Sequence, residues 1–99
     1  MEKSGCYLIH FDSEVPNVKK QYGDSRHYFG KSINIARRVN NHFTGCGSVV
    51  TRKAFKLGIG MKLALSWPGN DKKEHELVNS NLMKVCPICK ESNNNEVDH

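Results

Sequence analysis

The stretch HYFGKSINIARRVNNHF, residues 27–43, decides the fold of this chain, because it joins a short strand to a helix through one glycine corner. Its first five residues, HYFGK, predict a strand. Ser32 or Asn34 can then cap a helix, and Ile35 and Val39 recur at helical spacing together with the pair at 42–43. The sequence therefore predicts a strand that turns directly into a helix, which TGCG at 44–47 ends.

Two further strands follow from the sequence on either side of this unit. CYLIHF, residues 6–11, is a compact apolar run that predicts a buried strand paired with HYFGK. Residues 12–26 between them are polar and contain proline and glycine, so they predict a long loop. MKLALSW, residues 61–67, predicts a third strand that Pro68 and Gly69 close.

Two more helices are predicted after residue 47. One begins near Ser48 or Thr51 and stops at Gly58, with an apolar face of Val50, Ala54 and Leu57. In the other, Asp71 can cap a helix that runs to about Lys84 and turns Leu77, Leu82 and Val78 toward the core.

The predicted order indicates an α+β domain with a small, three-stranded, largely antiparallel sheet flanked by about three helices. With 99 residues the chain has room for one domain, which we assign to residues 1–90, and the polar, asparagine-rich residues 91–99 form a flexible tail. No segment has the length of a membrane span, and four scattered cysteines are not a disulfide framework, so a cytoplasmic location is expected. The net charge of +5 favours a polyanionic partner.

Several short motifs occur in a characteristic order. They are GCY at 5–7, YFG at 28–30, Arg38 ten residues after Tyr28, His42 one helical turn later, and a glutamate at position 74 that begins the last helix. Together they resemble the GIY-YIG nuclease superfamily over roughly residues 5–90. The terminal CPIC is similar to a group of small, stand-alone members.

The resemblance implies a metal-dependent endonuclease that hydrolyses DNA phosphodiester bonds by in-line attack of an activated water. It implies that Tyr7 takes the proton of the water, that Tyr28 positions it, and that Arg38 and His42 act on the phosphate from one helix face. A phenol with a pKa of about 10 is a weak base at neutral pH, so a cation such as Lys31 or the metal has to assist Tyr7.

Glu74 is the expected ligand of Mg²⁺ or Mn²⁺, since a hard cation prefers oxygen and keeps several waters. Glu76 is the rival ligand. Asn79 and Asn81 are candidates for an asparagine that supports the site in the family. Each match also has a plain structural alternative, such as a core tyrosine or a solvated helix face. The residues expected to contact the nucleic-acid backbone are basic: Lys19, Lys20, Arg26, Lys31 and Arg37.

Cys86 and Cys89 in CPIC have the spacing of half a zinc site. The other two ligands are expected from Cys46, Cys6, His75 or a second copy of the chain. The alternative interpretation is that both cysteines are packed apolar residues at a helix end.

Three functions are compatible with these patterns. The first is the metal-dependent DNA endonuclease, with RNA as an alternative substrate. The second is a nucleic-acid-binding module with a degenerate site, dimeric through CPIC. The third is a structural or interaction domain. With no added recognition domain, low sequence specificity or a targeting protein partner is expected.

Overall fold

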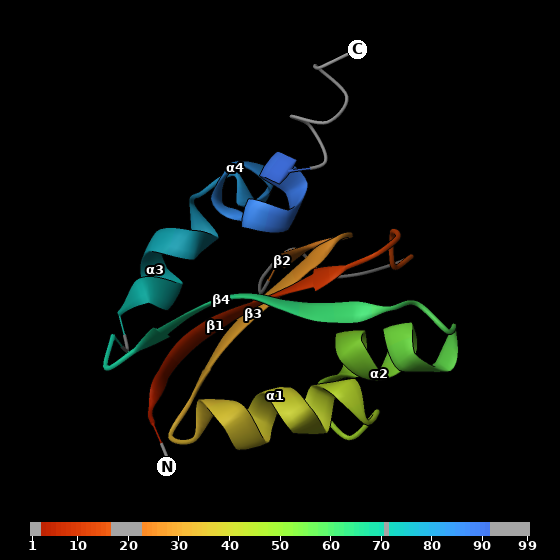
Figure 1. Cartoon of the computed structure of the whole chain (residues 1–99), viewed down its shortest axis with the longest axis horizontal. Helices are drawn as coiled ribbons and strands as arrows, with labels where there is room; N and C mark the ends of the chain where they lie inside the picture. Colours follow the sequence, from red (N-terminus) through yellow and green to blue (C-terminus); the bar gives the residue numbers. More distant parts are fainter. Residues whose placement is uncertain (1–2, 17–22, 71, 92–99) are drawn as a thin grey trace.

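The computed structural model describes residues 3–16, 23–70 and 72–91. Four strands form one antiparallel sheet in the order β2 (Gly23–Asp24), β3 (His27–Ser32), β1 (Gly5–Phe11) and β4 (Met61–Pro68) (Figure 1). The predicted α+β class is confirmed. The sheet has four strands rather than the expected three, because residues 23 and 24, which were predicted as loop, pair with the start of β3.

The helices lie on both faces of the sheet. Figure 1 shows α1 (Ile35–Phe43) and α2 (Val49–Lys56) on one face, and α3 (Lys73–Val78) and α4 (Leu82–Val85) on the other. Residues 87–91 add a further helical turn after α4. In the described ranges no helix combines the length and apolar character that crossing a bilayer would require.

The first two helices begin at predicted caps. The side chain of Asn34 accepts the backbone N–H of Arg37, and that of Ser48 accepts the N–H of Thr51. Along α2, Val50 is half-buried and Ala54 is buried, as predicted. The prediction for Leu57 is wrong: it is 55% exposed, because α2 ends one residue earlier and Leu57 is its C-cap.

The prediction of one continuous last helix is also wrong. The chain leaves the helix at Asn79, the C-cap of α3, and starts again after Asn81, whose side chain accepts the N–H of Met83. Asparagine side chains that bond the backbone compete with helical hydrogen bonds, which explains the break. Leu77 and Leu82 are buried as predicted, whereas Val78 is 57% exposed. The predicted cap Asp71 lies outside the described residues.

β1 is the centre of the fold, because all seven of its residues are buried. Its alternating side chains supply two cores. The core under α1 and α2 contains Tyr7, Ile9, Phe11, Val15, Ile35, Val39 and Ala54. The core under α3 and α4 contains Leu8, Phe29, Leu77, Leu82, Cys86 and Cys89.

Candidate functional site

Three aromatic rings meet on the α1 side of the sheet. The Tyr7 hydroxyl lies 2.8 Å from Nε2 of His42, and the Tyr28 ring centroid lies 5.1 Å from that of His42 and 6.5 Å from that of Tyr7. Gly30 pairs with Tyr7 across the strands, and a Cβ there would lie 2.8 Å from the Tyr7 hydroxyl oxygen. A glycine at position 30 therefore gives the hydroxyl its space, as close approach at the strand end predicts.

His42 is completely buried, and α2 fixes its ring from the far side. Its Nδ1 lies 2.7 Å from Oγ1 of Thr51, whose hydroxyl donates to the Ser48 carbonyl at 3.3 Å. Nδ1 also lies 3.4 Å from the backbone N of Ser48, so Thr51 and Ser48 together fix the orientation of the ring that contacts the Tyr7 hydroxyl. A Cβ at Gly47 would collide with the ring, so the TGCG turn also shapes the histidine pocket.

The surroundings of Tyr7 raise the pKa of its hydroxyl above that of a free tyrosine. Burial, and then the neighbouring Tyr28, raise the pKa of Tyr7 to about 12, although Arg38 opposes the rise with a hydrogen bond and its positive charge. The phenol is therefore protonated at neutral pH. If it accepts a proton from water, its own proton must leave, and His42 is the group in contact with it.

Glu74 lies on α3, on the face of the sheet opposite the one that carries α1 and His42 (Figure 1). It lies in the first turn of α3, is partly exposed, and its charge acts on Tyr7 to raise the pKa of the phenol. Tyr28 and Arg38 are partly exposed as well, so these two side chains form the solvent side of the site on the α1 face, while Tyr7 and His42 form its floor.

The remaining predicted residues lie farther from this group. Lys31 is exposed and pairs with Cys6, so strand alternation turns it away from the face that carries Tyr7; the cation acting on Tyr7 is Arg38. Arg37 is exposed on α1. The charge of Arg26 acts on His10 and Cys89, on the opposite face.

Three other predictions concern acidic, polar and basic residues of the loops and α3. Glu76 is exposed and pairs with Lys73 Nζ at 2.8 Å. The exposed Asn79 and Asn81 serve as helix caps. Lys19 and Lys20 lie outside the described residues.

Acid should destabilise the fold through His42. Burial, and then the charge of Arg38, lower its pKa to about 4, whereas an unfolded histidine titrates near 6.5. Between these values the unfolded chain binds a proton that the folded chain does not. The contribution of His42 to stability is therefore complete above about pH 6.5 and falls by up to about 1.4 kcal/mol per unit as the pH drops toward 4.

This prediction is checked by urea unfolding between pH 4 and 7. The variant His42→Gln should show a shallower acid slope, by close to one proton. His75→Gln is the control, because His75 is exposed on α3. Equal slopes for the wild type and His42→Gln would contradict the buried neutral histidine.

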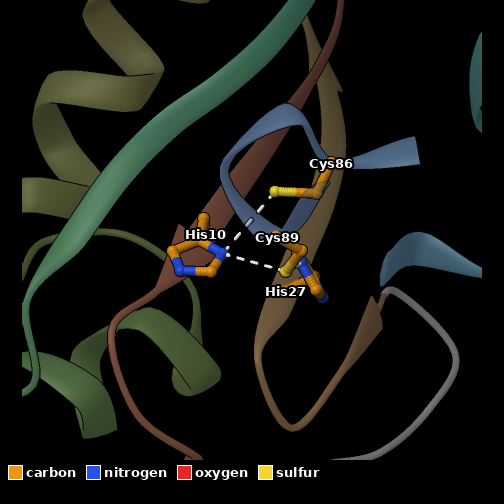
Figure 2. Close-up of side chains that lie close together, drawn as sticks. All are labelled: His10, His27, Cys86 and Cys89. Carbon is orange, nitrogen blue, oxygen red and sulfur yellow. Dashed lines mark hydrogen bonds between the residues drawn. The ribbon is translucent and has the colours of Figure 1, made fainter. Parts of the chain in front are cut away.

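A second cluster lies on the opposite face of the sheet. Figure 2 shows His10 from β1, His27 from β3, and Cys86 and Cys89 from the CPIC turn gathered around a common point. Their four ligand atoms all lie within 4.8 Å of one another, and all four residues are buried. The cluster could hold a metal ion.

Three separations within the cluster are close to those of a tetrahedral centre. His10 Nδ1 lies 3.6 Å from each of the two sulfur atoms, and His27 Nε2 lies 3.2 Å from Sγ of Cys89. Donors at about 2.3 Å (sulfur) and about 2.05 Å (nitrogen) from a tetrahedral ion lie about 3.3–3.8 Å from one another. Two thiolates and two neutral imidazoles around a divalent cation also give a centre without net charge, which suits a buried position.

Without a cation, burial disfavours charge in this cluster. Burial, and then Cys86, raise the pKa of Cys89 to about 11, and burial, and then His27, lower the pKa of His10. Binding of a metal would therefore displace a proton from the Cys89 thiol.

The expected sources of the missing ligands were wrong. Cys46 is exposed between α1 and α2, His75 is exposed on α3, and Cys6 is not in the cluster. The partners come from the strands instead, because His10 and His27 face each other directly in the β1–β3 register. An antiparallel register that pairs Tyr7 with Gly30 also pairs residues 10 and 27. Aligning the two predicted strands in this register would therefore have identified both histidines as ligands.

The two sites share one β-hairpin and lie back to back across it. Tyr7 and His10 alternate to opposite faces of β1, and Tyr28 and His27 do the same on β3. No protein-family model, curated protein or solved structure matches this chain.

Proposed function

We propose that this protein is a metal-dependent endonuclease of the GIY-YIG type that hydrolyses DNA phosphodiester bonds. The observation that carries the proposal is the Tyr7 hydroxyl, which lies 2.8 Å from His42 Nε2 and is hydrogen-bonded to Arg38. A hydroxyl coupled to a proton acceptor, an arginine and a carboxylate is the set that in-line phosphodiester hydrolysis needs.

In this proposal each residue of the site has one part in the hydrolysis. The Tyr7 oxygen accepts a proton from the attacking water while its own proton passes to His42 Nε2. The water oxygen bonds to phosphorus, the bond to the leaving oxygen breaks, and that oxygen takes a proton from solvent. Arg38 donates to the phosphate oxygens, and the negative phosphate favours the imidazolium form of His42, which the free chain disfavours.

Glu74 would hold the catalytic ion, Mg²⁺ or Mn²⁺. The fit follows from the chemistry of the donor: one partly exposed carboxylate, whose charge acts on the phenol, suits a hard cation that keeps most of its waters. When bound, the ion supplies positive charge to the phosphate and the leaving oxygen.

The ion in the His10, His27, Cys86 and Cys89 cluster is, in this proposal, Zn²⁺. Thiolate and imidazole donors in a four-ligand set favour zinc over magnesium, which prefers oxygen. Four protein ligands leave no open position, so its role is structural. Thiols that must stay reduced agree with a cytoplasmic location.

The second candidate remains a nucleic-acid-binding module with a degenerate site. The raised pKa of Tyr7 favours it to some extent, because a phenol that holds its proton also serves as a core residue. Dimerisation through CPIC is the less favoured form of this candidate, because Cys86 and Cys89 face His10 and His27 of the same chain.

A cleavage panel tests the proposal. The zinc-loaded protein is incubated with duplex, branched and single-stranded DNA and with RNA, before and after addition of Mg²⁺ or Mn²⁺. Cleavage that requires the added ion, at constant zinc content, supports the endonuclease. Loss of cleavage in EDTA alone does not distinguish the catalytic ion from zinc, because EDTA would remove both ions. Salt-sensitive binding without cleavage would select the binding module.

The variant Glu74→Gln should reduce Mg²⁺-dependent cleavage by about 100-fold or more, because the amide loses the charge that holds the ion. The matched control is Glu76→Gln, two residues along α3, whose carboxylate pairs with Lys73 instead. The measurement is the initial rate against Mg²⁺ concentration. Loss in Glu76→Gln with normal turnover in Glu74→Gln would reverse the assignment.

A further inference from the structure

The His27 ring is held at both of its nitrogens. Nε2 points into the cysteine cluster and lies 3.2 Å from Sγ of Cys89, while Nδ1 lies 2.9 Å from Oδ1 of Asp24. The ring is fully buried, so these two contacts determine its orientation. A histidine that binds a metal through one nitrogen commonly donates the other N–H to a carboxylate, which fixes both tautomer and ring direction.

Asp24 is positioned for this contact by the local fold. It lies in β2, pairs with His27 across the two-stranded turn, and its Oδ1 also accepts the backbone N–H of Arg26 at 2.8 Å. Its Oδ1 is therefore held between the His27 ring and the Arg26 backbone.

We infer that Asp24 is a positioning residue of the metal centre: it holds His27 as the Nδ1–H tautomer and so presents the Nε2 lone pair to the ion bound by His10, Cys86 and Cys89. The inference rests on the occupation of the cluster by a divalent metal, which is part of the proposed function, and is independent of the nuclease activity. It adds to the centre a carboxylate that binds no metal itself.

The contact would affect affinity in two ways. The hydrogen bond fixes the tautomer before the ion arrives, so no rotation or proton shift is needed. The negative charge makes the Nε2 lone pair a stronger donor. Loss of such outer partners typically weakens metal binding by about 10- to 100-fold.

Asp24 also has a purely structural role, since it accepts the N–H of Arg26 in the turn. Two substitutions separate these roles. Asp24→Asn keeps an oxygen for both hydrogen bonds but removes the charge, whereas Asp24→Ala removes the charge and both bonds. Asp12→Asn is the matched control: the Asp12 charge also acts on His10, but its carboxylate pairs with Lys62 Nζ at 3.4 Å.

The experiment is titration of the metal-free full-length chain with Co²⁺ and with Zn²⁺. The visible absorption of Co²⁺ reports tetrahedral thiolate coordination, and competition with a chelator of known affinity gives the dissociation constant. The fluorescence of Trp67, the single tryptophan, and far-UV circular dichroism of the loaded proteins verify folding.

The expected result is one equivalent of metal in every variant, with an affinity loss of about 10- to 100-fold in Asp24→Ala, a smaller loss in Asp24→Asn, and no loss in Asp12→Asn. An Asp24→Ala protein that binds as tightly as Asp12→Asn would overturn the role of Asp24 and leave the metal centre intact. A wild-type chain that binds neither ion would overturn the centre and the role of Asp24 together. Either result leaves the cleavage panel to judge the nuclease proposal separately.

Discussion

Replacing Cys89 with serine is expected to lower the melting temperature by more than about 10 °C, while replacing Cys46 with serine leaves it nearly unchanged. Both changes remove one thiol. Cys89 belongs to the buried cluster, whereas Cys46 is exposed between α1 and α2. The part of the difference that disappears when both proteins are compared without zinc would therefore measure the contribution of the ion, and the rest the loss of buried packing at Cys89.

The expected size follows from what the cluster connects. The Cys86 and Cys89 sulfurs lie beside His10, from which they are separated by 76 and 79 positions in the sequence. The segment they anchor is weak by itself, because α3 has six residues and α4 four, too few to be stable alone. Structural zinc sites contribute about 10–16 kcal/mol of apparent binding free energy, which is similar to the whole stability of about 5–15 kcal/mol of a small domain.

Thermal unfolding followed by circular dichroism and Trp67 fluorescence is the measurement. Trp67 is a sensitive position, since Lys73 of α3 lies over its ring at 5.1 Å and undocking of α3 would change its surroundings. The zinc content of each variant should fall with its melting temperature. A Cys89→Ser protein that melts like Cys46→Ser, in zinc-loaded form, would show that the cluster does not stabilise the fold.

Local patterns predicted the unit at residues 27–43 well, because its determinants are local. The Asn34 cap and the helical spacing of Ile35, Val39 and His42 act within a few residues, and all three of these side chains are buried. The break between α3 and α4 was missed although Asn79 and Asn81 are visible in the sequence. The apolar spacing of Leu77 and Leu82 continues across the break and concealed it.

The metal centre was only half predicted for a different reason. The spacing of the two cysteines in CPIC indicates a metal site, but the histidines that complete it lie 62 or more positions away in the sequence. Strand register, rather than sequence spacing, brings these histidines together. His10 lies in the run predicted as a buried apolar strand, and His27 lies in the strand predicted to pair with it. A buried histidine side chain needs a hydrogen-bond partner or a metal ion. The two histidines in the predicted strands were therefore the sequence feature that pointed to the missing ligands.

The candidate active site shows what motif resemblance can and cannot supply. It selected Tyr7, Tyr28, Arg38 and His42, which do meet in one place. It did not supply Thr51, which fixes His42 from a helix without a motif match. It also placed Lys31 beside Tyr7, whereas the alternation of β3 turns Lys31 to the opposite face.

The largest expected effect on activity is that of Arg38→Ala, which should reduce cleavage by about 100- to 1000-fold with little change in stability. Arg38 is the cation that acts on the Tyr7 hydroxyl, and it is partly exposed, so it can donate to a phosphate bound over the phenol. Its charge is needed most when negative charge accumulates in the transition state. The loss should therefore occur mainly in kcat.

Arg37→Ala is the matched control for this prediction, because the two arginines are neighbours on α1 but point about 100° apart around the helix. Arg37 is exposed, and its removal should weaken nucleic-acid binding slightly and reduce the salt dependence of binding by about one phosphate contact without lowering kcat. Arg38→Lys should recover little activity, since an ammonium lacks the planar fork that contacts two phosphate oxygens together. Equal losses in Arg37→Ala and Arg38→Ala would indicate that both arginines only attract the polyanion, and the site would then be a binding surface rather than a catalytic one.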